Sequence, residues 1–270
     1  MGVSLYYLPA VETIGECMKF SIVTISFNQR EYLEACIESV LSQQGVDVEY
    51  IVVDPGSTDG SRELIASYGD RLTSVFEADA GPADGLNKGF SKATGDIYGF
   101  INSDDYLLPD ALRCVESFFD GKSRDSNTFV TGHGLIDYGV QPLTPVFPNV
   151  LSAEGMVQLA DIVFQQSTFF PANLYRAVGG FNVNNRTCWD YELFLRFLLN
   201  GANHSVVDQQ LGVFRLYEGS ISGSGNLQER CLEDVDALFL EIKGRERNCL
   251  DNVKKYYLRL LRELKRKLGV

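Results

Sequence analysis

The chain of 270 residues has no long hydrophobic run. None of its apolar segments approaches the roughly 18 residues that a helix needs to cross a bilayer. Residues 1–18 also lack the charged start and apolar centre of a secretion signal. We therefore expect a cytoplasmic protein. With 45% hydrophobic residues, the chain has enough apolar side chains for a sizeable core.

Cysteine and histidine are also scarce. The six cysteines are never closer than 18 positions, which excludes a CxxC metal or redox pair and indicates reduced cysteines used for packing. The two histidines, His133 and His204, lie in apolar strand-like runs, where a structural role is the better interpretation. No GxGxxG follows the first predicted strand and no GxxxxGK[ST] occurs, so dinucleotide and P-loop sites lack their phosphate-binding loops.

Positive charge is in short supply over most of the chain. The net charge is −12, which disfavours non-specific nucleic-acid binding, because that binding depends on cationic contacts to phosphates. We expect no nucleic-acid partner. The exception is residues 253–268, which hold seven of the 24 basic residues and one of the 36 acidic residues. The sequence thus predicts a basic C-terminal tail on an acidic body.

Short apolar runs alternate with helical patterns over the first 120 residues. The runs at 20–27, 49–54, 72–78 and 96–102 predict buried strands. Between them, Leu33, Ile37, Val40 and Leu41 repeat on one face of a helix of about 13 residues, and segments 59–68 and 84–93 predict two more helices. This alternation predicts an α/β fold with a mostly parallel sheet and helices on both faces. Ligands of such sheets bind at the carboxyl ends of the strands.

Two polar segments occupy those strand ends. In "NSDD", Asp104 and Asp105 follow an apolar strand and precede a helix predicted to begin at Pro109. They could be plain turn residues, but adjacent carboxylates at a ligand-binding edge are best explained by a shared divalent cation. In "DPGSTDG", Asp54 could accept a hydrogen bond from a nucleotide base, whereas Ser57, Thr58 and Asp59 are typical of helix caps.

Three longer segments resemble glycosyltransferase family 2. They are "SIVTISFNQREYLEACIESVLSQQ" with "EYIVVDPGSTDGS", then "ADAGPADGLNKGFSKATGDIYGFINSDDYLLPDAL", and finally "QQSTFFPANLYRAVGGFNVNNRTCWDYELFLRFLLNGA". The resemblance covers about residues 19–220. It implies the GT-A fold, with one Rossmann-like sheet divided into a nucleotide-sugar-binding half (19–120) and an acceptor-binding half (121–222), followed by a helical extension (223–270). It also implies transfer of a sugar from a nucleotide donor, with inversion.

The resemblance assigns roles in the first half. Asp105 is expected to bind Mn²⁺ or Mg²⁺, and Asp104 the ribose or a position beside the metal. Ser26, Phe27, Asn28 and Asp54 are expected to hold the base. Asp84, Asn87 and Lys88 are candidates for closing over the nucleotide, although Asn87 and Lys88 could equally be exposed helix residues.

The catalytic base is expected at the start of a second-half helix. In "TCWDYELFLRF", Leu193, Phe194, Phe197 and Leu198 form the apolar stripe, and Asp190 and Glu192 lie in the first turn. The helix N-terminus favours the ionised form of a carboxylate. The resemblance implies Asp190 as the base, a role compatible with capping the helix, and Trp189 and Glu192 as contacts to the acceptor or supports beside it.

Two positions depart from the family pattern. Tyr217 occupies the position of a histidine that binds the metal in some members, and Pro55 replaces an acidic residue next to Asp54. A protonated tyrosine is a poor ligand for Mg²⁺ or Mn²⁺, so the metal is expected to have fewer protein ligands. The departures leave open a non-catalytic nucleotide-sugar-binding subunit, although a subunit without activity would not need Asp190. A nucleotidyltransferase would leave the acceptor-side motif unexplained.

The tail at 253–270 predicts an amphipathic helix with one apolar and one basic face. It could pack on the body or on a second subunit, leaving the charged face in solvent. It could instead lie on an anionic membrane, at the inner face of the cell membrane. That arrangement would suit a lipid-linked acceptor in bacterial surface polysaccharide assembly, and a UDP-sugar is the favoured donor.

Overall fold

The computed structural model describes residues 18–120, 126–217 and 228–268, and the predicted alternation of strands and helices is found in its first part. The elements in chain order are β1 (Lys19–Ile25), α1 (Arg30–Leu41), β2 (Asp47–Val53), α2 (Ser61–Ser67), the 3₁₀ turn η1 (Gly69–Arg71), β3 (Thr73–Val75), α3 (Pro82–Phe90) and β4 (Ile97–Asn102). The four strands pair in parallel in the order β3-β2-β1-β4. Their carboxyl ends therefore meet at one edge.

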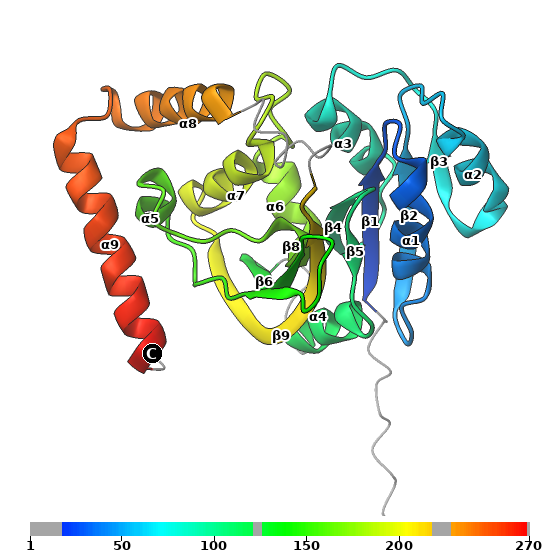
Figure 1. Cartoon of the computed structure of the whole chain (residues 1–270), viewed down its shortest axis with the longest axis horizontal. Coiled ribbons are helices and arrows are strands. Elements are labelled where there is room, and N and C mark those ends of the chain that lie inside the picture. The colour runs from blue at the N-terminus through cyan, green and yellow to red at the C-terminus, as the bar shows by residue number, and fades with distance from the viewer. Residues whose placement is uncertain (1–17, 121–125, 218–227, 269–270) are drawn as a thin grey trace, which may run out of the picture.

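The second part extends the same sheet. It comprises β5 (Tyr106–Leu107), α4 (Ala111–Phe119), β6 (Thr128–Asp137), β7 (Thr144–Val146), α5 (Ala153–Val157), η2 (Gln165–Ser167), β8 (Thr168–Pro171), α6 (Ala172–Ala177), α7 (Trp189–Leu199) and β9 (Asn203–Arg215). The strand order continues β4-β8-β6-β9-β5, with β7 on β6. Here most pairs are antiparallel, while β6 and β9 are parallel. The predicted fold class is confirmed, and the two halves share one curled sheet (Figure 1).

Helices cover both faces of the sheet, as predicted. One apolar cluster joins side chains of α3, α6 and α7, such as Leu86 and Phe194, to the sheet, and a second joins those of α1, α2 and α4, such as Ile37 and Val115. α3 lies very close to β1, because a Cβ at Gly89 would lie 2.4 Å from Cγ1 of Val23. This contact fixes the segment before α3 at the carboxyl edge of the sheet.

Several boundaries differ from the prediction. β3 ends at Val75, so residues 76–78 of the expected strand are loop, and α3 begins at Pro82, two residues early. α4 begins at Ala111 and not at Pro109, because Asp110 has a left-handed backbone with φ of 61°. Strand ends and helix starts depend on turn geometry, which hydrophobic periodicity does not encode.

Two helices form an arm at the side of the molecule away from β3 (Figure 1). They are α8 (Gln228–Lys243) and α9 (Cys249–Leu268). α8 anchors the arm, since Val235 and Phe239 are buried. Among the described residues, no helix has both the length and the apolar character required to span a bilayer.

Candidate functional site

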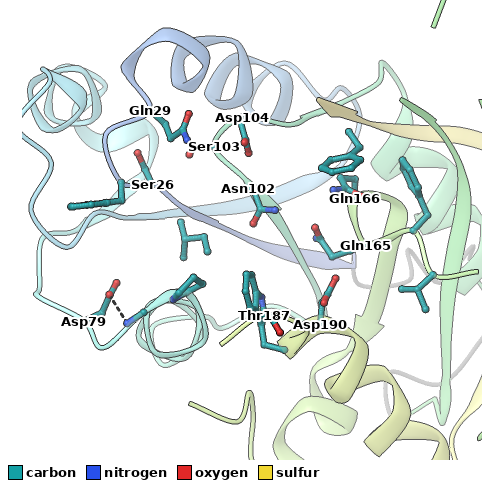
Figure 2. A pocket seen from close by; sticks show the side chains of 18 of the residues that line it. Ser26, Gln29, Asp79, Asn102, Ser103, Asp104, Gln165, Gln166, Thr187 and Asp190 are labelled. Carbon is teal, nitrogen blue, oxygen red and sulfur yellow. Dashed lines mark hydrogen bonds between the residues drawn. The ribbon is translucent and has the colours of Figure 1, made fainter. Parts of the chain in front are cut away.

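A cavity of about 950 Å³ opens at the carboxyl ends of β1 and β4, where the two halves of the sheet meet. Polar side chains of the first half form one side, which we call the strand-end floor: Ser26, Asn102, Ser103 and Asp104. Six hydrophobic side chains of the second half form another side, which we call the apolar wall: Ile136, Val146, Ile162, Val163, Phe164 and Phe214. Figure 2 shows Asp104 and Asp190 on opposite sides of this pocket.

The strand-end floor contains polar atoms that the described part of the chain leaves unsatisfied. Ser26 Oγ, just after β1, and Asn102 Oδ1, the last residue of β4, are buried and have no hydrogen-bond partner among the described residues. Buried polar atoms in native proteins nearly always find a partner. Because both residues line the cavity, their missing partners are best supplied by a bound ligand.

The adjacent carboxylates Asp104 and Asp105 have different environments. Asp105 is fully buried and lies outside the pocket lining, and it accepts hydrogen bonds from Gln166 Nε2 at 2.9 Å and from the Arg215 backbone N–H at 2.9 Å. Asp104 is half-buried and faces the pocket. Each oxygen of Asp105 thus accepts one hydrogen bond in the interior, and the expected metal role of Asp105 stays a prediction. Asp104 is the carboxylate of the pair that lines the pocket.

Burial and mutual repulsion act on both groups. Burial, followed by the nearby charge of Asp104, raises the pKa of Asp105 well above its usual range. Burial also raises the pKa of Asp104, although the hydroxyl of Tyr217 and the guanidinium of Arg215 oppose this shift. Two neighbouring carboxylates with raised pKa values form a site where an added cation would be stabilising.

Tyr217, at the position expected for a metal-binding histidine, contacts Asp104. Its hydroxyl lies 3.0 Å from Gln29 Oε1 and 3.2 Å from Asp104 Oδ2, and it can donate to either. Burial, together with the charge of Asp104, raises the pKa of Tyr217 to about 12. Tyr217 therefore stays protonated and acts on Asp104 as a hydrogen-bond donor.

The donor set fits Mg²⁺ or Mn²⁺ held by few protein groups. The carboxylate of Asp104 and the unpaired amide oxygen of Asn102 are hard oxygen ligands on one side of the pocket. Within the described residues, no group of three or more His, Cys, Asp or Glu side chains is arranged to hold a metal ion. Mg²⁺ commonly binds through one or two carboxylates plus substrate phosphates, so this small set is sufficient.

The turn after β2 is stabilised internally by Asp54. This carboxylate is fully buried and accepts hydrogen bonds from the N–H groups of Gly56 and Ser57 and from Ser57 Oγ at 2.6 Å. Pro55, and not Asp54, lines the pocket. Asp54 thus has a structural role in this turn, and its expected contact with a base stays a prediction. The Ser57 hydroxyl donates to Asp54 and accepts the Asn28 N–H instead of capping α2.

Asn28 and Asp59 also hold this edge together. Asn28 Oδ1 accepts the N–H of Thr58, which ties the loop after β1 to the loop after β2, and Asn28 lies outside the main pocket. Asp59 accepts the N–H of Ser61, the first residue of α2, although the N-cap position itself is Gly60. Phe27 is 60% exposed and does line the pocket, so of the two loop residues only Phe27 can contact a ligand there.

The three α3 candidates do not line the pocket, and two of them, Asp84 and Lys88, position the loop at 78–81. Asp84 accepts the N–H of Ala80 and pairs with Lys88 at 3.0 Å, while Lys88 donates to the carbonyl of Ala78. Asn87 binds the second half, accepting from the Phe181 N–H at 2.9 Å and donating to the Phe181 carbonyl at 2.9 Å. The ligand-facing group of this segment is Asp79, whose pKa is raised by burial.

Asp190 and Trp189 face the pocket from the first turn of α7. Burial raises the pKa of Asp190, although its carboxylate accepts the N–H of Tyr191 at 2.8 Å. Desolvation therefore outweighs the expected stabilisation of the ionised form by the helix N-terminus. Cys188, and not Asp190, occupies the N-cap position. The buried indole Nε1 of Trp189 has no partner among the described residues, so it can donate to a ligand.

Glu192 does not reach the pocket. It is buried and accepts hydrogen bonds from Asn185 Nδ2 at 2.7 Å and Asn182 Nδ2 at 3.0 Å. The loop between those asparagines and α7 is thereby fixed, which places Asp190 and Thr187 at the cavity. Of the two roles expected for Glu192, contact to the acceptor or support beside it, these hydrogen bonds favour the support, and the role in the site stays a prediction.

Sequence patterns missed part of the lining. Gln165 and Gln166 precede β8 and line the pocket while donating to the Phe100 carbonyl and to Asp105. Their signal in the sequence was their place at the start of the third family-like segment, "QQSTFFP". His204 is buried, accepts the Leu151 N–H and has a pKa lowered by burial to about 3, and neither histidine lines the pocket, in line with a structural role.

Comparisons with known sequences identify the first half. The model of glycosyl transferase family 2 matches residues 21–138. An uncharacterized glycosyltransferase of Nostoc sp. is 39% identical over 106 residues, 37% of this chain and 33% of that protein. The putative teichuronic acid biosynthesis glycosyltransferase TuaG of Bacillus subtilis is 28% identical over 217 residues, 76% of this chain and 81% of that protein. The matched region covers 33%, 58% and 32% of the lengths of the first three curated relatives.

Solved structures share the fold. S. aureus TarS 1–349 in complex with UDP-GlcNAc superposes with a TM-score of 0.67 at 19% identity, covering 90% of this chain and 70% of that one. The mannosyltransferase PcManGT from Pyrobaculum calidifontis, in complex with GDP-Man and Mn²⁺, gives 0.63 at 17% identity, covering 90% and 69%. At these identities the likeness is one of fold.

Proposed function

Because this chain belongs to glycosyltransferase family 2, we propose that it transfers a sugar from a nucleotide-diphosphate donor to an acceptor hydroxyl, with inversion at the anomeric carbon. The observation that carries the proposal is the shared pocket. Unsatisfied polar atoms and Asp104 line its first-half side, and Asp190 faces it from the second half. A binding side and a candidate base thus meet in one cavity.

The nucleotide is proposed to lie on the strand-end floor. Ser26 and Asn102 have free hydrogen-bonding capacity there, and Phe27, Pro55 and Asp79 line the same side. Phe27 offers an exposed ring on which a base can stack. A UDP-sugar is favoured, in keeping with the UDP-GlcNAc bound to the structural neighbour TarS.

Asp104, with the amide oxygen of Asn102, is proposed to hold Mn²⁺ or Mg²⁺, while Asp105 supports the strand end from the interior. The ion, when bound, would neutralise charge that develops on the departing nucleoside diphosphate. Tyr217 then orients Asp104 when its hydroxyl donates to that carboxylate, with Gln29 Oε1 as the alternative acceptor. The neighbour PcManGT contains Mn²⁺.

Asp190 is proposed to take the proton from the attacking acceptor hydroxyl. Its pKa is raised by burial, which makes the carboxylate a stronger base than one in water. The N–H of Tyr191 holds one carboxylate oxygen, leaving the other for the acceptor. Trp189 Nε1 can donate to a second acceptor oxygen.

The acceptor is proposed to be a saccharide or a lipid-linked saccharide in bacterial surface polysaccharide assembly. TuaG, which matches most of this chain, is named for teichuronic acid biosynthesis. The apolar wall beside Asp190 can pack against the carbon face of a sugar or against a lipid segment. The alternative hypothesis, a non-catalytic nucleotide-sugar-binding subunit, does not explain why Asp190 faces the pocket.

A screen of UDP-, GDP- and dTDP-sugars for Mn²⁺-dependent thermal stabilisation tests the donor, because a ligand that binds only the folded state raises its stability. We expect a UDP-sugar to give the largest shift. Incubation of the stabilising donor with saccharide acceptors then tests transfer. A donor bound without transfer or hydrolysis would favour the non-catalytic subunit, and stabilisation by no nucleotide-sugar would contradict both hypotheses.

A further inference from the structure

α9 carries a continuous apolar face that the described part of the molecule does not cover. Seven large side chains on it are 47% to 75% exposed: Leu250, Val253, Tyr256, Tyr257, Leu260, Leu264 and Leu268. Their spacing at three and four residues places them on one face of the helix. Isolated exposed apolar residues are ordinary, but a contiguous set indicates an interaction surface.

The opposite face of α9 attaches the helix to the body through polar contacts. Arg259 Nη2 donates to the Leu159 carbonyl at 2.9 Å, Arg262 donates to the Ala160 carbonyl, and Lys254 pairs with Glu154 at 2.6 Å. These contacts reverse the expected packing, in which the apolar face would lie on the body and the charged face in solvent. Their consequence is that the apolar face points outward.

Contacts at the junction of α8 and α9 fix this orientation further. Asp251, in the first turn of α9, is buried and accepts from Arg245 at 2.7 Å. Arg247 lies over the ring of Phe239 on α8 and donates to the Val157 carbonyl. α9 is therefore held by its own start as well as by Arg259 and Arg262, so its rotation about the helix axis is set before any partner binds.

The charge of α9 distinguishes between partners. The helix has seven basic and two acidic residues, whereas the rest of the chain is strongly acidic. Lys265 and Lys267 are exposed and form no ion pair with a described residue. A second copy would bring two positively charged helices together along this face. An anionic surface would instead be attracted to the helix and repelled only by the acidic body.

We propose that α9 lies on the surface of an anionic lipid bilayer, with its apolar face in the boundary between headgroups and acyl chains. An apolar face, a basic remainder and tyrosines with polar tips are the features of such interfacial helices. Each basic residue near the surface strengthens the attraction. The inference does not depend on the proposed sugar transfer, since it rests on the arm and not on the pocket.

Vesicle co-sedimentation of the full chain tests this proposal. We expect binding to phosphatidylcholine vesicles containing 30% phosphatidylglycerol, at least tenfold weaker binding to phosphatidylcholine alone, and loss of binding in 0.5 M NaCl. No binding to the anionic vesicles at low salt, or equal binding to both kinds of vesicle, would overturn the proposal. The outcome leaves the nucleotide-sugar screen unaffected, so the two proposals can fail separately.

Two variants locate the surface. The double variant Leu260→Ser/Leu264→Ser removes two exposed apolar side chains and should weaken binding more than tenfold, and Lys265→Gln/Lys267→Gln should weaken binding to anionic vesicles alone. Leu232→Ser, at a leucine 61% exposed on α8, is the matched control and should bind normally. Equal binding by wild type and the Leu260/Leu264 variant would overturn the assignment. A dimer in light scattering that this variant abolishes, without vesicle binding, would identify a second copy as the partner.

Discussion

The strand-end floor and the apolar wall face the same cavity but are built differently. The floor follows parallel strands, and its carboxylate and amide groups retain hydrogen-bonding capacity for a ligand. The wall comes from β6, β7, β9 and the loop before η2, and the second half also contributes Asp190 to the pocket. We infer from this difference a division of labour, in which the floor is proposed to bind a charged donor and the second half to shape the acceptor and remove its proton. Binding and turnover should therefore be separable by mutation.

The largest expected effect is that of Asp190→Asn on turnover. Asparagine keeps the shape but cannot accept a proton, so the transfer rate should fall by ~10²-fold or more, the usual scale for a general base. Affinity for the donor, measured by isothermal titration calorimetry with Mn²⁺, should stay near that of the wild type. If the transfer rate and the donor affinity fell together, Asp190 would take part in donor binding and not in proton removal.

Asp104→Asn should act on binding. Loss of the pocket-facing carboxylate should weaken Mn²⁺-dependent nucleotide binding by about tenfold or more, equivalent to at least about 1.4 kcal/mol. The neighbouring substitution Asp105→Asn is the control, because Asp105 contacts Gln166 and Arg215 and not the pocket. It should lower thermal stability and leave the metal dependence in place. If Asp105→Asn abolished the metal dependence of binding and Asp104→Asn did not, Asp105 would be the metal ligand.

Asn87, on α3 of the first half, bonds Phe181 of the second half, so Asn87→Ala should weaken the contact between the two halves. The substitution leaves the N–H and carbonyl of Phe181 without their partner, which should lower the free energy of unfolding by about 2 kcal/mol. Urea denaturation measures this change. Lys88→Ala, one position along α3, removes a partly exposed ion pair with Asp84 and a hydrogen bond to the Ala78 carbonyl, and it should cost less, about 1 kcal/mol. Equal losses would show that Asn87 does not connect the halves.

The smallest effect concerns pH. Asp190 must be ionised to act as a base, and burial raises its pKa above the ordinary 3.8. Transfer should therefore decline as the pH falls through a midpoint above 3.8, and the pH profile of kcat measures this. Donor binding, followed separately by calorimetry, reports Asp104 instead. An acid limb in kcat at or below the ordinary value would mean that the base is more exposed than the structure indicates.

Periodicity was enough to predict the parallel sheet, because β1, β2 and β4 are apolar runs between helices with clear stripes such as Leu33, Ile37 and Val40. The antiparallel pairings of the second part were harder to predict from the sequence, because pairings such as β4 with β8 join residues about 70 positions apart. The strand ends were found, but which of Asp104 and Asp105 faces outward depends on the turn between β4 and β5. Sequence spacing does not encode that orientation.

Several polar residues also show that a sequence motif does not reveal which side chains reach the ligand. Asp54, Asn87 and Glu192 are polar residues in functional-looking motifs, yet each is satisfied by backbone or amide groups of the protein. The partner of Asn87 is Phe181, 94 positions away, whereas those of Asp54 and Glu192 lie in adjacent turns whose geometry hydrophobic periodicity does not encode. Gln166 was passed over because nothing local marks a glutamine as the partner of a carboxylate 61 positions away. Polar residues at strand ends are therefore good guides to where a site lies, and weaker guides to which atom reaches the ligand.

The two-residue strand β5 has a consequence for how the molecule assembles. It pairs with β9, and the residues that hold Asp104 and Asp105 in place, Arg215 and Tyr217, follow them by 110 to 113 positions. Closing a loop of that length early in folding is entropically unfavourable, so local strand-helix units should form first. A nascent chain ending near residue 120 would already contain most of the parallel sheet. Its nucleotide site would become ordered only when the last strand of the second half arrives.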